Sequence, residues 1–257
     1  MADDSYSVHW IPVIVFIGVP LTFLTTFAIA VSLGHVEADF PYISDTGTKS
    51  PESCIFGQLL NLAALLIGLN IYVRYKQIEH HLSHHNNIKL QRANHVSLYI
   101  GLIAAFGMSM VGNFQETNVL VVHLIGAILA FGIGGVYGTI HVVISYKCHP
   151  HLTSLRICHL RAVLCAVIFI TFIANAISKR YFHGNDPRKW YPKDGGFTYH
   201  VISTASEWIM ASSLLVYFVT FYSEFRHLRM APPRVVVVEL SNSGLVGDTV
   251  DDVPILS

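Results

Sequence analysis

Charged residues are scarce in this chain, and this scarcity excludes most soluble folds. Only 12% of its 257 residues are Asp, Glu, Lys or Arg, whereas about 25% is typical of soluble domains. Sixteen basic side chains balance sixteen acidic ones, so no net field attracts nucleic acid and we expect no nucleic-acid partner. The composition, 53% hydrophobic, favours a membrane protein.

Several chemical motifs are absent as well. The four cysteines follow no metal-ligand spacing, and the sequence contains neither His-Glu-x-x-His nor Gly-x-Ser-x-Gly. The acidic start Met-Ala-Asp-Asp is unlike the basic beginning of a secretory signal peptide, so we expect the first apolar segment to be retained. These absences predict no metal and no cofactor, and they make an enzyme the weaker interpretation.

Long apolar segments are abundant. Six of them are Trp10–Leu33, Ile55–Val73, Val96–Val111, Val119–Ser145, Arg161–Ser178 and His200–Tyr222. A bilayer core of about 30 Å requires about 20 such residues per helix, and a helix satisfies its own backbone hydrogen bonds in lipid. The sequence therefore predicts an all-α fold, a polytopic six-transmembrane-helix bundle over residues 1–222, followed by a flexible cytosolic tail over residues 223–257.

The distribution of Lys and Arg favours one orientation. An even number of spans places both termini on one side, and the segments on that side hold ten of the sixteen basic residues. The positive-inside rule therefore predicts cytosolic termini, although Lys179 and Arg180 at a span end oppose it. The loop Arg74–His95 is then cytosolic. Its histidines suggest a metal or pH-sensing site, or more simply a solvated polar loop.

Small residues recur every four positions on two neighbouring spans. They are Gly101, Ala105 and Ser109 on the third span and Gly126, Ala130, Gly134 and Gly138 on the fourth. Residues four apart share a helix face, and small faces allow close helix packing in lipid. We therefore predict that these spans are antiparallel neighbours. Glycine is common in membrane helices, so the spacing can also arise without a packing role.

Polar residues are expected to gather near the non-cytosolic ends of several spans. Glu207 lies well inside the sixth span, and a carboxylate there must face the bundle, find a partner or stay protonated. His200 lies seven residues earlier on the same helix face. The candidate ligand-binding residues are Asp45, Asn61, Asn113, Gln115, His123, His200 and Glu207. Together they predict a polar pocket that opens toward the non-cytosolic leaflet.

Three other interpretations of these polar residues stay open. They can hydrogen-bond one another and simply hold helices together. Glu207, His200 and His123 can instead serve acid–base chemistry in a lipid-remodelling enzyme. An intramembrane Glu and His can also relay protons in a transporter, although the sequence shows no repeat of the three-plus-three kind.

The end of the chain carries a candidate sorting signal. Asp251 precedes Ile255 and Leu256 by four and five residues, which resembles an acidic dileucine signal. Clathrin adaptors bind such peptides by accepting the aliphatic pair in an apolar slot and the acid on a basic patch. We therefore expect an adaptor as a partner of the tail, and delivery to endosomes or lysosomes.

Several runs of sequence resemble one family. They are Pro-Tyr-Ile-Ser-Asp-Thr-Gly at 41–47, Ile-Tyr-Val-Arg-Tyr-Lys at 71–76, Asn-Phe-Gln at 113–115, His-x-x-Gly at 123–126 and Thr-Ala-x-Glu-Trp at 204–208. They resemble the DNA-damage-regulated autophagy modulator (DRAM) family across all six spans. Its members are six-span proteins, typically lysosomal, that promote autophagy and in some cases cell death. The wider superfamily includes a protein of GPI-anchor lipid remodelling and plasma-membrane proteins that help to place a phosphatidylinositol 4-kinase.

This resemblance implies a membrane protein that modulates autophagy. We expect it in lysosomal or late-endosomal membranes, with the plasma membrane as the alternative. We expect the pocket to bind a membrane lipid or a partner helix, and the loops and tail to recruit cytosolic autophagy factors. No family motif assigns a catalytic role to a residue here.

Overall fold

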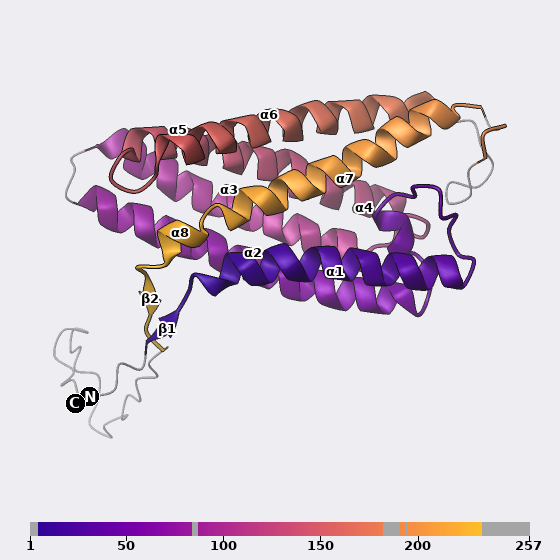
Figure 1. Ribbon diagram of the computed structural model, residues 1–257, viewed down its shortest axis with the longest axis horizontal. Coiled ribbons are helices and arrows are strands. Elements are labelled where there is room, and N and C mark those ends of the chain that lie inside the picture. Colours follow the sequence, from indigo (N-terminus) through magenta and orange to yellow (C-terminus); the bar gives the residue numbers. More distant parts are fainter. Residues whose placement is uncertain (1–4, 84–86, 182–190, 194, 233–257) are drawn as a thin grey trace, which may run out of the picture.

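The computed structural model describes residues 5–83, 87–181, 191–193 and 195–232, and within them the chain forms a bundle of long helices (Figure 1). The helices are α1 (Trp10–Ser32), α2 (Glu52–Ser83), α3 (Ile88–Asn113), α4 (Leu120–Ala127), α5 (Gly134–Cys148), α6 (Leu155–Ser178), α7 (Phe197–Val219) and α8 (Tyr222–Phe225). A π-helical segment, η2 (Ile128–Ile133), joins α4 to α5 without interruption. Two 3₁₀ turns, η1 (Ser44–Gly47) and η3 (Lys179–Tyr181), lie in loops.

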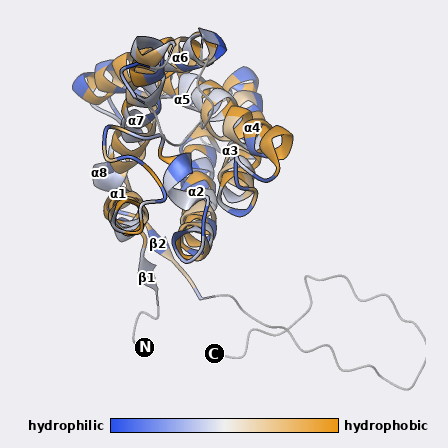
Figure 2. Ribbon diagram, turned by 90° about the vertical axis from the view of Figure 1, so that its right-hand side faces the viewer, coloured by the Kyte–Doolittle hydropathy of each residue, from blue (hydrophilic) through white to orange (hydrophobic). Residues whose placement is uncertain are grey.

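Six stretches of helix are long and apolar enough to cross a membrane, which confirms the predicted all-α, six-span fold. Large apolar side chains project outward from them, for example Leu21 at 61%, Leu65 at 72% and Ile170 at 66% exposure. Figure 2 shows this apolar colouring on the outer faces of the helices. Lipid tails can cover such a surface, and water cannot do so without a large free-energy penalty. The chain is therefore a multi-pass membrane protein.

Most helices extend beyond the apolar spans predicted for them. α2 continues ten residues past Val73 to Ser83, and α3 begins at Ile88 rather than Val96. The predicted loop Arg74–His95 is therefore largely helical, with residues 84–86 outside the described part. Hydropathy marks only the part of a helix that contacts lipid, and polar side chains continue these helices where they can pair inside the protein or reach water.

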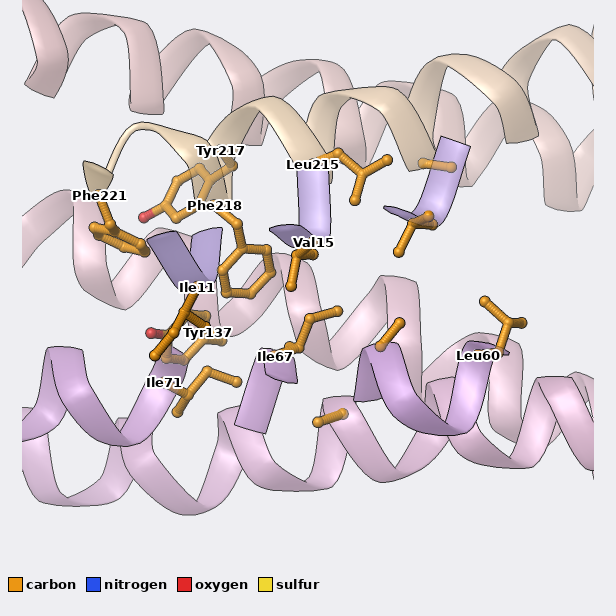
Figure 3. Close-up of a cluster of buried hydrophobic side chains, with 14 of the residues drawn as sticks. Ile11, Val15, Leu60, Ile67, Ile71, Tyr137, Leu215, Tyr217, Phe218 and Phe221 are labelled. Atoms are coloured by element: carbon orange, nitrogen blue, oxygen red, sulfur yellow. The ribbon is translucent and has the colours of Figure 1, made fainter. Parts of the chain in front are cut away.

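The helices pack around one apolar core. Figure 3 shows Ile11 and Val15 of α1 opposite Leu215 and Phe218 of α7, with side chains of α2 on the other side. Most of these side chains are less than a tenth exposed. A membrane bundle gains little from the hydrophobic effect between its helices, so close packing of such side chains supplies much of its cohesion.

α3 packs directly against α4 and η2, and the two elements are neighbours as predicted from sequence. The two elements lie very close at Gly107, where an added Cβ would lie 2.5 Å from the Cβ of Leu129, 2.6 Å from the backbone nitrogen of Ala130 and 2.7 Å from the carbonyl oxygen of Gly126. Gly107 lies outside the predicted ridge of α3. A glycine is needed there because backbone, and not a movable side chain, fills the space.

The predicted small residues divide among several interfaces. Gly126 faces Met110 of α3, and a Cβ added to Gly134 would lie 3.8 Å from the Cβ of Ala104. Gly138 faces Cys165 of α6 and Tyr217 of α7 instead, and its carbonyl accepts a hydrogen bond from the Tyr217 hydroxyl at 2.9 Å. On α3, Gly101 faces Ile71 and Tyr137. Ala105 joins the core and Ser109 hydrogen-bonds to α2.

The predicted tail begins later than residue 223. α8 is packed into the bundle, with Phe225 fully buried, and β2 (Arg229–Met230) pairs antiparallel with β1 (Tyr6–Ser7). Both strands lie at one end of the bundle, which we call the terminal end (Figure 1). We call the opposite end, where η1 lies, the loop end. The apolar side chains of α8 explain the correction, because they continue the core of α7.

Replacing Gly107 by Ala should destabilise the bundle by about 1–3 kcal/mol, since overpacking against backbone cannot relax through a rotamer change. A lower melting temperature of the purified protein in detergent checks this. Gly132→Ala is the matched control, because the nearest atom to its added Cβ is a Phe172 side-chain carbon at 3.4 Å. Equal melting temperatures for the two variants would contradict the packing assigned to Gly107.

Candidate functional site

At the loop end, η1 folds back into the bundle and closes it. Its residues Ser44–Gly47 are all buried. The Thr46 hydroxyl hydrogen-bonds that of Thr26 on α1 at 3.0 Å, and the Trp208 indole of α7 donates to the Pro41 carbonyl at 3.0 Å. Gly47 lies so close to Phe56 of α2 that a Cβ would overlap its ring. The loop is therefore fixed to three helices and forms a lid of defined shape.

A cavity lies in the bundle beneath this lid. Its volume is about 100 Å³. Its lining is apolar almost throughout, with side chains such as Phe23, Met108 and Leu215. Glu207 and Ser44 supply the polar groups at its wall. The cavity suits an apolar chain or side chain with a polar group at one end.

Of the seven predicted ligand-binding residues, all within the described part of the chain, Glu207 lines this cavity. It lies on α7 and is partly buried. The neighbouring Ala211, one turn further along, lines the same cavity. The other six residues are at the loop end too, outside the wall of this cavity.

Asn61 and Asn113 form one group. Each amide nitrogen donates to the other's oxygen, at 3.1 and 2.8 Å. The Ser109 hydroxyl donates to Asn61 Oδ1 at 2.6 Å, and Asn113 Nδ2 also donates to the Ser109 carbonyl at 2.7 Å. This network joins α2 to α3, as interhelical hydrogen bonds do in membrane proteins.

A second group surrounds His123 of α4. Its Nδ1 hydrogen-bonds the Phe114 carbonyl at 2.8 Å, and its Nε2 lies 4.0 Å from Glu116. Glu116 also accepts a hydrogen bond from Ser44 of the lid at 3.0 Å. The loop after α3 is thereby connected to η1 on one side and to α4 on the other.

The remaining three candidates have different surroundings. Gln115 caps the turn before α4, where its side-chain oxygen accepts a hydrogen bond from Asn118 at 3.2 Å. His200 is buried edge-on against Tyr42, with ring centroids 5.3 Å apart. Asp45 is buried in η1, and its carbonyl accepts a hydrogen bond from Thr48. Several of the polar residues thus shape the lid and its supports, and Glu207 is the one of the seven that lines the apolar cavity.

A buried ionic cluster at the terminal end was not predicted from the sequence. Glu224 of α8 lies between two arginines, Arg74 of α2 and Arg161 of α6, and forms an ion pair with each. The Arg161 Nη2 atom lies 2.7 Å from Glu224 Oε1, and both arginines are fully buried. Glu224 lies on the continuation of the sixth span, so this span carries a buried carboxylate in addition to the partly buried Glu207.

Neutral groups complete this cluster. Every nitrogen of the Arg161 guanidinium has a partner: Nε donates to Thr220, Nη1 donates to Ser145, and Nη2 donates to Glu224. The Phe221 ring contacts both guanidinium groups, with its centroid 4.3 Å from the Arg161 Cζ atom and 5.0 Å from the Arg74 Cζ atom. The aromatic ring attracts both cations.

The sequence signal for this cluster was weak but present. Hydropathy places Arg74 and Arg161 at span edges and Glu224 in the tail, where charges are ordinary. The informative spacing is Arg74 to Gln77, one helical turn apart. Gln77 accepts a hydrogen bond from Arg74 at 2.6 Å and donates one to the Glu224 carbonyl at 2.9 Å.

Replacing Glu224 by Gln should lower stability by about 3–5 kcal/mol, because it leaves two buried arginines without their counter-charge. Thermal unfolding in detergent measures the loss. The matched control is Glu79→Gln, which breaks the exposed ion pair with Lys76 on α2 and should change stability by about 1 kcal/mol or less. A Glu224→Gln protein as stable as this control would refute the structural role of the cluster.

Known proteins of one family are similar to this chain over most of its length. A family model described as the Frag1/DRAM/Sfk1/Cwh43P N-terminal domain matches residues 7–228. The chain is 35% identical to DNA damage-regulated autophagy modulator protein 2 of Bos taurus, covering 87% of this chain and 86% of that protein. It is 39% identical to DNA damage-regulated autophagy modulator protein 1 of Homo sapiens, covering 81% and 87%.

A third relative is the modulator of macroautophagy TMEM150B-B of Xenopus laevis, 34% identical over 79% of each chain. No solved structure matches. The matched region begins in β1 and ends just before β2, so it includes every helix from α1 to α8. The chain therefore belongs to the Frag1/DRAM/Sfk1/Cwh43P family, as its resemblance to the DRAM proteins predicted.

Proposed function

We propose that this chain modulates autophagy from lysosomal or late-endosomal membranes, as a binding protein rather than an enzyme. Relatives that cover most of its length are named autophagy modulators. In this proposal the cavity beneath η1 accepts a lipid chain or an apolar side chain of a partner helix. In this proposal, binding of a ligand in the cavity changes how the protein interacts with autophagy factors.

The observation that carries this proposal is an apolar cavity inside the bundle with a carboxyl group at its wall. An apolar cavity among packed helices loses dispersion contacts, and here it lies next to a partly buried carboxylate, Glu207. An amphipathic molecule would restore those contacts and place its polar group at the wall that Glu207 forms. Tyr137 and Phe218 line the same cavity, so its occupant would lie among side chains that α2, α5 and α7 share.

Filling the cavity should abolish binding without unfolding the protein. Ala211→Leu adds three carbons to the cavity wall, and Glu207→Gln removes the charge there. We expect both variants to lose co-purifying lipid or partner and to reduce autophagic flux, measured by turnover of a lipidated autophagosome marker in cells that lack the native protein.

Ala166→Leu is the matched control, because Ala166 is an exposed residue of α6. It should behave like the unmodified protein. If Ala211→Leu and Glu207→Gln left binding and flux unchanged, the cavity would have no part in the function. Lipid turnover by the purified protein that is lost in Glu207→Gln would instead support the lipid-remodelling enzyme.

The proposed location depends on the C-terminal signal. Asp251, Ile255 and Leu256 lie outside the described residues. Replacing Ile255 and Leu256 by Ala should prevent adaptor binding and move the protein to the plasma membrane, as surface biotinylation would detect. Val235→Ala with Val236→Ala, an aliphatic pair further from the end, is the control. Unaltered delivery of the Ile255/Leu256 variant to lysosomes would contradict the sorting signal.

A further inference from the structure

The terminal end holds a second pocket, separate from the cavity beneath η1. It has a volume of about 750 Å³ and lies between the end of α2, the loop from α5 to α6, and the segment from α8 to β2. This volume lies within the range of small-molecule sites. None of the seven candidate ligand-binding residues lies in its wall.

One side of this pocket is rich in hydrogen-bond donors. They are Lys76, His80, His81, His151, His227 and Arg229, drawn from three separate parts of the chain. The rings of His81 and His151 lie 6.0 Å apart, so α2 and the α5–α6 loop bring donors together. Thr153 and Ser154 add hydroxyl groups to the same wall. Such a set of donors is suited to the oxygens of a phosphate.

The charge of the pocket is positive. Glu224 is its only acidic lining residue among those that the structure describes, and Arg74 and Arg161 more than balance it. Lys76 has an acidic neighbour, Glu79 at 2.6 Å, but Glu79 lies outside the pocket wall. Arg229 adds a further positive charge with no described acidic partner to offset it. The pocket therefore attracts anions.

A metal ion is a weaker explanation for these histidines. Among the residues that the structure places, no three His, Cys, Asp or Glu side chains are close enough to hold a metal together. Lys and Arg beside the histidines would also repel a cation.

The other side of the pocket is apolar. Val8, Tyr72, Val73, Ile157 and Met230 line it. Tyr72 and Val73 belong to the part of α2 that hydropathy assigns to the membrane. A ligand that uses the whole pocket must therefore combine a phosphate with an apolar portion that continues along the helices into the bilayer.

We propose that this pocket binds the headgroup of an anionic phospholipid with an accessible phosphate, of the class to which phosphatidic acid belongs. Lys76 and Arg229 contact the phosphate as charged donors, and the histidines contribute further N–H groups. The acyl chains leave the pocket along Tyr72 and Val73. This site is independent of the cavity beneath η1 and lies at the opposite end of the bundle.

Native mass spectrometry of the purified full-length protein in detergent, with added phosphatidic acid, tests the proposal. The pocket variant combines Lys76→Gln with Arg229→Gln. The matched control combines Lys89→Gln with Lys147→Gln, which removes the same charge from exposed positions outside the pocket wall. Because Lys76 and Arg229 are also exposed, both variants should keep the melting temperature of the unmodified protein.

We expect phosphatidic acid to bind more tightly than phosphatidylcholine or phosphatidylserine, and the pocket variant to weaken its binding by about tenfold or more, since each charge-assisted hydrogen bond is strong. The control should bind as the unmodified protein does. Glycerol phosphate, which carries the phosphate without acyl chains, should bind much more weakly.

Four results would overturn the proposal: equal losses in the pocket and control variants, equal binding of the three lipids, unchanged binding in the pocket variant, or glycerol phosphate that binds as tightly as the lipid. Ala211→Leu separates this site from the cavity beneath η1. It should leave phosphatidic acid binding unchanged, and a loss there would assign the lipid to that cavity instead.

Discussion

One buried carboxylate holds the terminal end of this bundle together. Glu224 pairs with arginines from α2 and α6, accepts a hydrogen bond from Thr153 in the loop between α5 and α6, and lies directly after α7. Helices in lipid are not driven together by the hydrophobic effect, so a charge that must be neutralised inside the protein constrains which helices meet. The four chain segments that meet at Glu224 also form the wall of the terminal-end pocket.

The two ends of the bundle are built on different chemistry. At the terminal end, full charges are paired and stacked on Phe221. At the loop end, neutral amides such as Asn61 and Asn113 join helices, alongside histidine–carboxylate contacts such as that of His35 with Glu52. Between them the interior is apolar and includes the cavity next to Glu207. The ion-paired end and the cavity are thus separate parts of the bundle.

The sequence predicted the spans well because hydropathy is a property of each residue, independent of its neighbours in space. It predicted side-chain contacts between helices poorly because these contacts depend on the orientation of each helix about its axis. Glu207 was correctly identified as an intramembrane carboxylate, but Arg74 and Arg161 looked like ordinary charges at span edges. Their burial becomes visible only when α2 is seen to continue to Ser83 and α8 to continue the sixth span beside it. Gly107 was missed for a similar reason, since its partner is the backbone of another helix.

The short ladder between β1 and β2 gives the protein a mechanical connection. Ser7 pairs with Arg229, and Arg229 lines the terminal-end pocket. The strand that leads out of the bundle toward the C-terminus is therefore also part of the wall of this pocket. A factor that pulls on the C-terminal segment would apply force to this two-residue ladder before it reaches any helix. Separating two residue pairs requires much less force than unfolding a packed helix. Force on this segment would thus reach Arg229 first and weaken its contact with the proposed lipid, before the packed helices are disturbed.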